Sequence, residues 1–202
     1  MPPLPHHGQC VEGCDHQKTG PGKTGAHRLN RNPLNKSNLD PIRPYRPGDL
    51  GAVQRIYGQA IAAGFCTADL EPPHQSRWDE WGKTHEDPRF PVYIWEEKAQ
   101  VLGYCSLTPY RPGRRGLSRT AEVSYFVDFA NHGRGIGRSL VLHTLEQAVA
   151  LDFHVVFAII LEANQPSQDL LAELGFSRWG YLPEVFRYAG AWHGQVYLGK
   201  VL

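Results

Sequence analysis

The feature that most constrains this sequence is a glycine-rich turn between a strand-like and a helix-like segment. The stretch Asn131–Arg138 reads N-H-G-R-G-I-G-R, with glycine at positions 133, 135 and 137. Glycine lets the backbone approach a ligand closely and adopt angles that other residues avoid. The first amides of a helix have no partner within the helix, and together with the helix dipole they attract anions. The guanidinium groups of Arg134 and Arg138 pair well with phosphate oxygens, so the turn is predicted to bind a pyrophosphate.

Two other phosphate-binding patterns fit the sequence less well. A dinucleotide fingerprint that starts at Gly133 would need a glycine where Arg138 stands. The stretch Gly20–Thr24 resembles the end of a P-loop, but Gln17 occupies the place of its first glycine and no strand precedes it. The remaining alternatives are a plain strand-to-helix connection and a nucleotide-binding module of another kind.

Composition excludes several classes of protein. The formal net charge of +1, from 21 basic and 20 acidic residues in 202, gives no electrostatic footprint for nucleic acid or a membrane surface. No apolar run is long enough for a spanning helix, and no secretory signal is visible at the start. The 4 cysteines do not form a disulfide framework pattern, so we expect a cytoplasmic protein with reduced thiols.

The first 40 residues differ from the rest of the chain. They contain none of the 5 Trp, 9 Tyr and 8 Phe residues and show no apolar periodicity. Such a segment cannot bury enough surface to offset its ordering entropy, so we expect a disordered arm over 1–40 and a folded domain over 41–202. Cys10, Cys14 and His16 are metal-ligand residue types, but they lack the paired spacing of common zinc sites, and no metal is expected.

The folded part is predicted to mix helices and strands. Apolar residues at helical spacing predict helices over about 49–63, 74–85, 135–151 and 165–174. Runs rich in β-formers predict strands over about 42–45, 92–96, 101–108, 120–128, 154–161, 178–183 and 195–201. The nearly continuous apolar run at 154–161 is typical of a strand covered on both faces.

The turn resembles the signature of the GNAT superfamily of N-acetyltransferases, which reads Gln or Arg, two residues, Gly, one residue, then Gly or Ala. The segment His132–Gly137 matches the glycines and has His132 where Gln or Arg is usual. Further motifs follow in the order found in phosphinothricin-type members: Glu71-Pro72-Pro73, Thr120–Val127, Asn164 with Ser167, Leu174-Gly175-Phe176, Gly180-Tyr181-Leu182 and Trp192-His193. The resemblance covers roughly Ile42 to Leu202.

This resemblance implies an α/β fold of the α+β kind. It would have a mixed, mostly antiparallel sheet of about six or seven strands, splayed between the fourth and fifth and flanked by about four helices. Acetyl-CoA would lie in the splay as co-substrate, with its pantetheine arm paired along Tyr125, Phe126 and Val127 like an added strand. Asn164 matches the position that bonds this arm, and Ser167 lies one helical step beyond. The pyrophosphate would lie on the turn residues His132, Gly133, Arg134, Gly135, Ile136, Gly137 and Arg138.

Glu122 is the candidate catalytic base. An ammonium group is not a nucleophile, so a base must remove its proton, and Glu122 matches the glutamate of the T-A-E motif in the phosphinothricin type. A carboxylate in a partly dry cleft has a raised pKa, which suits this role. A backbone amide near Phe126 or Val127 could donate to the thioester oxygen. Cys105 has no His or Asp partner placed for nucleophilic catalysis.

The acid that protonates the leaving thiolate is left open. Relatives carry Tyr or His at the position of Leu171, which cannot donate a proton. Tyr125, Tyr188 and His193 are the alternatives, and unassisted departure is another, because a thiol pKa near 8.5 makes a fair leaving group.

The acceptor is predicted to be a small, amino-acid-like primary amine. Glu71, Arg111, Tyr188 and His193 are the candidate contacts, with Arg111 placed to capture a carboxylate. The alternatives are a protein or peptide N-acetyltransferase and a non-catalytic acyl-CoA sensor. The resemblance makes a homodimer possible.

Overall fold

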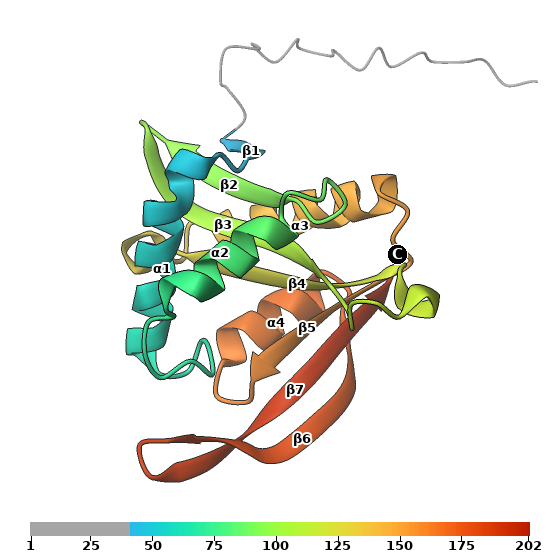
Figure 1. Ribbon diagram of the computed structural model, residues 1–202. Helices are drawn as coiled ribbons and strands as arrows, with labels where there is room; N and C mark the ends of the chain where they lie inside the picture. Colours follow the sequence, from blue (N-terminus) through green and yellow to red (C-terminus); the bar gives the residue numbers. More distant parts are fainter. Residues whose placement is uncertain (1–40) are drawn as a thin grey trace, which may run out of the picture. The chain divides into compact units, whose positions relative to one another are not determined.

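The computed structural model describes residues 41–202, which form a seven-stranded sheet with helices packed on it (Figure 1). The predicted arm over 1–40 and its Cys10, Cys14 and His16 lie outside the described residues. Within the described range, no helix is both long and apolar enough to cross a membrane.

The order of elements matches the alternation predicted from the sequence. The helices are α1 (Leu50–Ala63), α2 (Gln75–Thr84), α3 (Ile136–Ala150) and α4 (Gln165–Glu173). The strands are β1 (Ile42–Pro44), β2 (Val92–Glu97), β3 (Gln100–Pro109), β4 (Thr120–Val127), β5 (Val155–Leu161), β6 (Ser177–Tyr188) and β7 (Ala191–Val201).

The sheet is antiparallel except at its centre, where β4 and β5 run parallel. Its strand order is β1-β2-β3-β4-β5-β7-β6. β4 and β5 pair at only three positions, the last being Glu122 with Phe157. Beyond that point β4 stays paired with β3 as far as Val127, and β5 stays paired with β7 as far as Leu161. The predicted fold is confirmed, including the splay between the fourth and fifth strands.

Two apolar clusters bind the helices to opposite faces of the sheet. Val53 and Ile56 of α1 and Trp78 of α2 pack against Ile94 and Tyr104. The second cluster joins α3 and α4 to the sheet through Leu140, Leu145, Leu171, Cys105, Leu107 and Val123. Tyr104 and Cys105 are neighbours in β3 but belong to different clusters, as the alternation of side chains along a strand requires.

The β6–β7 hairpin is longer than the sequence predicts and extends away from the helices (Figure 1). Pro183 lies inside β6, and proline ordinarily marks a strand end because it has no amide to donate. Here a register shift between Leu182 and Phe186 accommodates it, with Glu184 at a φ of 52°. The strand therefore continues to Tyr188.

Candidate active site

The glycine turn follows β4 and leads directly into α3. Gly133 and Gly135 have φ angles of 75° and 78°, in the left-handed region that favours glycine. Gly137 has a different reason to be glycine, because a Cβ there would lie 3.3 Å from the Tyr125 ring. Together these residues bring the first amides of α3 to the end of β4.

Asp128, at the end of β4, fixes the position of this turn. Its buried carboxylate forms an ion pair with Arg55 of α1 and accepts hydrogen bonds from Gln59 (3.3 Å), the Ala130 amide (3.1 Å) and the Asn131 side chain (3.3 Å). The pKa of Asp128 is lowered, mainly by Arg55. The anionic side chain thus ties the turn to α1, a role that sequence reasoning missed.

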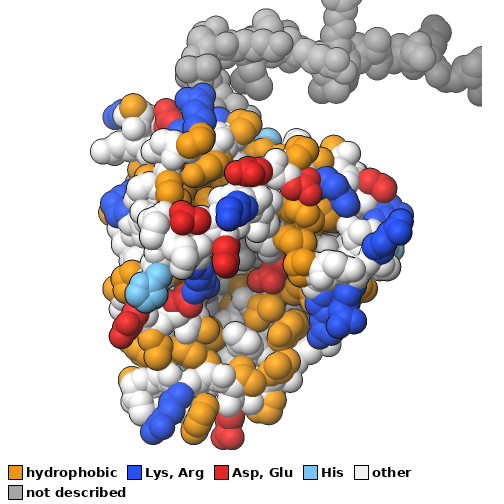
Figure 2. All heavy atoms as spheres, viewed as in Figure 1, with side chains coloured by type: hydrophobic (Ala, Val, Ile, Leu, Met, Phe, Trp, Pro, Cys, Tyr) orange, Lys and Arg blue, Asp and Glu red, His pale blue; other side chains and the backbone are white. Residues whose placement is uncertain are grey.

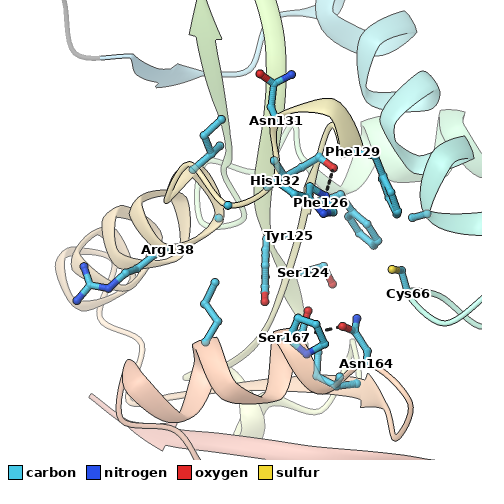
Figure 3. Close-up of a pocket in the computed structure, with 18 of the residues that line it drawn as sticks. Cys66, Ser124, Tyr125, Phe126, Phe129, Asn131, His132, Arg138, Asn164 and Ser167 are labelled. Carbon is cyan, nitrogen blue, oxygen red and sulfur yellow. Dashed lines mark hydrogen bonds between the residues drawn. The ribbon is translucent and has the colours of Figure 1, made fainter. Parts of the chain in front are cut away.

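The charged and aromatic side chains of the turn have separate tasks. His132 Nε2 lies 3.0 Å from the Val127 carbonyl and pins the turn to β4. Arg134 donates to Asn131 (2.6 Å) and to Glu97 (2.7 Å), so its side chain is held outside the cleft. Arg138 lines the cleft and is exposed, and Figure 3 shows its guanidinium directed outward from α3. Arg138 is therefore the arginine free to meet a phosphate.

A cleft of about 390 Å³ opens where β4 and β5 part. All the residues predicted to bind the cofactor line it, with the exception of Arg134: Tyr125, Phe126, Val127, His132, Gly133, Gly135, Ile136, Gly137, Arg138, Asn164 and Ser167. Figure 3 shows Tyr125 between the turn and α4, with Asn164 and Ser167 at the foot of the cleft.

The exposed edge of β4 presents backbone groups to this cleft. The Asp128 amide bonds the Leu102 carbonyl, and this bond fixes which residues of β4 face β3. In an antiparallel pair the facing residues alternate, so the amide of Phe126 is turned toward β3 and those of Tyr125 and Val127 toward the cleft. A ligand with amide groups can pair with this edge as a further strand would.

The other wall of the cleft begins with Asn164, the N-cap of α4. Its side-chain oxygen accepts the Ser167 amide at 3.3 Å, as is typical of asparagine at a helix start. This bond leaves the Asn164 amide group as a donor at the cleft. The described residues therefore offer hydrogen-bonding groups on both walls of the splay.

The Tyr125 hydroxyl has no hydrogen-bond partner among the described residues, although it is buried. Burial raises the pKa of Tyr125 to about 12, even though the nearby Ser167 hydroxyl acts to lower it. An unpaired buried hydroxyl costs about 1–3 kcal/mol, which a ligand in the cleft would relieve.

Glu122 faces a second cavity, of about 330 Å³, on the α1–α2 side of β4. The two cavities share the lining residues Cys66, Ser124, Phe126 and Ile159. Burial raises the pKa of Glu122, and no other described residue forms a hydrogen bond or ion pair with its carboxylate. Glu122 is thus available to take up a proton next to the cleft.

The residues predicted to contact an acceptor lie outside both cavities. Glu71 and Arg111 are exposed, and Arg111 lies over the Tyr110 ring. Tyr188 packs against Gly64, where a Cβ would lie 2.4 Å from its ring. His193 lies beside Phe186 in the hairpin. The structure does not bring these four side chains together around Glu122.

The second cavity is instead lined by residues that sequence reasoning did not select. Among the described residues, Arg77 is the one cation on its wall, and its guanidinium donates to both oxygens of Asp69 at 2.8 Å. The aromatic lining consists of Tyr57, Trp78, Trp81, Tyr104 and Phe126. The helical spacing of Trp78 and Trp81 in the sequence predicted a buried helix face, but that pattern does not indicate a binding site.

The cysteines of the described chain carry free thiols that stay protonated. Burial raises the pKa of Cys66 to about 11 and that of Cys105 to about 12. Cys105 is fully buried, so it cannot reach a substrate. Leu171 is also fully buried in the core. Among residues 41–202 no three His, Cys, Asp or Glu side chains gather as metal ligands.

These features decide the family. The model of the Acetyltransferase (GNAT) family matches residues 58–176, which include Glu122, the glycine turn and Asn164. The chain belongs to the GNAT family. It is an N-acetyltransferase, and acetyl-CoA is its co-substrate.

Curated relatives agree with this assignment. The chain is 35% identical over 155 residues to YwnH of Bacillus subtilis, provisionally named a phosphinothricin acetyltransferase, covering 76% of this chain and 94% of that protein. It is 30% identical over 152 residues to the L-methionine sulfoximine/L-methionine sulfone acetyltransferase of Pseudomonas aeruginosa, covering 75% and 88%.

Solved structures are similar over the same region. A ribosomal-protein-alanine N-acetyltransferase from Brucella melitensis has a TM-score of 0.74 at 30% identity, covering 80% of this chain and 99% of that one. The protein yncA from Salmonella typhimurium, provisionally named an acetyltransferase and solved with its cofactor acetyl-CoA, has a TM-score of 0.75 at 28% identity, covering 82% and 95%.

The raised pKa of Glu122 predicts a trade-off between activity and stability. A group whose pKa is raised on folding contributes stability at low pH, and this contribution is lost as the pH rises through the folded-state pKa. E122Q, which stays neutral, should therefore melt at a higher temperature than the wild type at pH 8 without ligands. The difference should shrink as the pH falls toward the ordinary glutamate pKa of about 4.3. Scanning calorimetry across this pH range measures it, and a pH-independent difference would contradict the burial of an ionisable Glu122.

Proposed function

We propose that this protein transfers the acetyl group of acetyl-CoA directly to the primary amine of a small, amino-acid-like acceptor. The observation that carries the proposal is the position of Glu122, in a cavity that shares a wall with the cofactor cleft. An amine in that cavity and a thioester in the cleft would be neighbours. Alignment of two reactants in one site supplies much of the acceleration of such a transfer.

The chain's own groups support a ternary complex. Bound acetyl-CoA supplies the acetyl group as a thioester. Glu122 takes the proton of the acceptor ammonium, because its raised pKa makes it a stronger base than an exposed glutamate. The amides of Tyr125 and Val127 face the cleft and can donate to the thioester oxygen. Cys66 lies between the cavities, but its raised pKa keeps it a thiol, which disfavours a covalent acyl-enzyme.

E122Q tests this mechanism. Loss of the base should lower kcat by about 10²–10⁴-fold. Acetyl-CoA should still stabilise both proteins, by about 2.7 kcal/mol at a concentration 100 times its Kd, because binding to the folded state alone raises stability. A coupled assay of CoA release and a thermal shift titration measure the two effects. Unchanged turnover in E122Q would show that Glu122 is not the base. The absence of a thermal shift with acetyl-CoA would show that the cleft does not bind it.

The acceptor cavity also supports a class of acceptor. Glu122 and Arg77 line the same cavity, so the amine and the carboxylate of an amino acid would each face a charge of opposite sign. The Trp78, Trp81 and Phe126 rings offer an apolar surface for the side chain. The named acceptors of the Pseudomonas relative, L-methionine sulfoximine and L-methionine sulfone, are likewise amino acids.

R77Q tests the recognition of the carboxylate. It should lower kcat/KM for amino acids by about 10- to 100-fold, as the loss of about 1.5–3 kcal/mol from a charged hydrogen bond implies. An amine with the same side chain but no carboxylate should be acetylated slowly, and at the same rate by the wild type and by R77Q. R111Q is the comparison, because Arg111 is the sequence-based candidate and lies outside the cavity. A loss in R111Q with none in R77Q would move the carboxylate site to the β3–β4 loop.

A second candidate acceptor is a protein N-terminus, which the similarity to a ribosomal-protein-alanine N-acetyltransferase favours. A peptide N-terminus has the same amine but no adjacent free carboxylate. Peptides that begin with alanine, assayed beside free alanine, separate the two acceptors. Acetylation of the peptide that is insensitive to R77Q would favour the protein substrate.

We further propose that the protein is a homodimer joined through the β6–β7 hairpin. Several large apolar side chains of this hairpin are exposed: Trp179, Tyr181, Leu182, Val185, Tyr188 and Trp192. Figure 2 shows hydrophobic side chains gathered over the lower part of this face, where the hairpin lies in Figure 1. A contiguous exposed apolar surface of this kind favours a protein interface.

The interface prediction is tested by a charge in the hairpin. Trp192 is 57% exposed, and W192E should convert the dimer to a monomer, because a buried unpaired carboxylate is costly. V149E is the control, since Val149 of α3 is 60% exposed and lies far along the chain from the hairpin. Light scattering after size-exclusion chromatography measures the mass. A monomeric wild type, or equal behaviour of both variants, would contradict the prediction.

A further inference from the structure

We propose that Tyr125 is the general acid that protonates the sulfur of CoA as the acetyl group departs. The inference rests on the proposed direct transfer, which leaves the electron pair of the broken bond on sulfur. The observation that carries it is the Tyr125 hydroxyl, which is buried in the cofactor cleft and forms no hydrogen bond among the described residues.

The hydroxyl of Tyr125 is buried, lacks a hydrogen bond within the described chain and lies in the cofactor cleft. The Tyr125 ring packs closely on Gly137 at the start of α3, because a Cβ added at Gly137 would lie only 3.3 Å from the ring. This contact holds the ring in place. Figure 3 shows the ring directed down the cleft toward Ser167 of α4, away from the glycine turn. The structure thus orients a proton donor into the splay, near the Ser167 hydroxyl but without a formed hydrogen bond among the described residues.

The position along β4 fits the sulfur rather than the phosphates. The glycine turn lies beyond Val127, and Glu122 lies at the other end of the splay, where β4 and β5 last pair. The reacting carbon must be close to the amine that Glu122 deprotonates. Tyr125 lies between these two ends, about 10 Å along the strand from Glu122 at roughly 3.3 Å per residue. Its side chain points to the α3–α4 side of β4, opposite to that of Glu122, so the acid and the base approach the thioester from different sides.

The other candidates from the sequence are less well placed. Leu171 is fully buried in the core and carries no proton to donate. Tyr188 and His193 lie in the hairpin and line neither cavity. Cys66 lines the cleft, but as an acid it would leave a second thiolate in place of the first. Within the described chain, Tyr125 is therefore the cleft-lining side chain with a free acidic proton.

The acceptor nitrogen bonds to the acetyl carbon, and the bond between that carbon and sulfur breaks with its electron pair left on sulfur. Tyr125 gives its hydroxyl proton to the sulfur, Glu122 holds the first proton taken from the ammonium, and the second proton of the nitrogen passes to water once the new bond has formed. Exchange with water returns Glu122 and Tyr125 to their starting forms. Burial keeps Tyr125 protonated at neutral pH, and the same raised pKa makes the phenol a weaker acid than an exposed tyrosine.

Y125F is the direct test, with Y93F as the matched control, because Tyr93 of β2 lines neither cavity. Y125F should lower kcat by about 10²-fold, at the low end for general acids, because a thiolate is a fair leaving group. With the selenoester analogue of acetyl-CoA the loss should nearly vanish, since a selenolate departs without a proton. Y93F should lose no activity with either ester. An equal loss in Y125F with both esters would overturn the proposal and make Tyr125 a positioning residue.

A second readout needs no turnover. A hydroxyl that donates to sulfur stabilises the thiolate, so the pKa of the thiol of bound CoA should be lower in the wild type than in Y125F. The ultraviolet absorbance of the thiolate, titrated on the enzyme–CoA complex, measures this difference. An identical thiol pKa in both proteins would also overturn the proposal. E122Q should leave this titration unchanged, so failure of the proposed base and failure of the proposed acid are distinguishable.

If Y125F does not fold, 3-fluorotyrosine at position 125 keeps the ring and the hydroxyl. A more acidic phenol donates a stronger hydrogen bond, so the pKa of the bound thiol should fall below its wild-type value. An unchanged thiol pKa in this variant would contradict the assignment.

Discussion

The parting of β4 and β5 is the constraint on which the rest of the site depends. The two strands share only three paired positions, although each stays fully paired with its outer neighbour. Backbone amides on the inner edge of β4 are therefore left without a partner strand, a state that a sheet ordinarily avoids. Ligand amides can complete this edge, and the glycine turn continues it into an anion site. The cleft is thus created by the separation of two backbone strands, and the side chains only line it.

Groups placed at unfavourable positions gather around this gap. Within residues 41–202, Glu122 is partly buried without an ion-pair partner, and the Tyr125 hydroxyl is buried without a hydrogen bond. Each lowers the stability of the empty protein, and the two apolar clusters offset this cost from either face of the sheet. The groups that the fold satisfies poorly are the ones that the transfer reaction can use.

Charges that are satisfied have a different task, which is to hold the turn and the cavity in place. Asp128 ties the turn to α1 through Arg55, and Glu97 draws the Arg134 side chain out of the cleft. Asp69 likewise orients Arg77 on the wall of the acceptor cavity. Such exposed or half-exposed pairs contribute little stability by themselves. Their value lies in geometry, because they decide which cations remain free for a ligand.

The sequence by itself determined the elements and the chemistry that adjacent residues create. Helical and strand spacing, the glycines of the turn, Glu122 on its strand and Asn164 at its helix start all depend on local geometry, and local geometry can be read from a single stretch of chain. Tertiary structure decided what depends on distant segments. Arg111 lies in the β3–β4 loop and lines neither cavity, whereas Arg77 of α2 and Glu122 of β4 line the same cavity although they are far apart in the sequence. Pro183 predicted the end of a strand, but pairing with β7 continues β6 beyond Pro183 to Tyr188. The direction of the Tyr125 hydroxyl likewise follows from the approach of α3 at Gly137, which the order of residues does not specify.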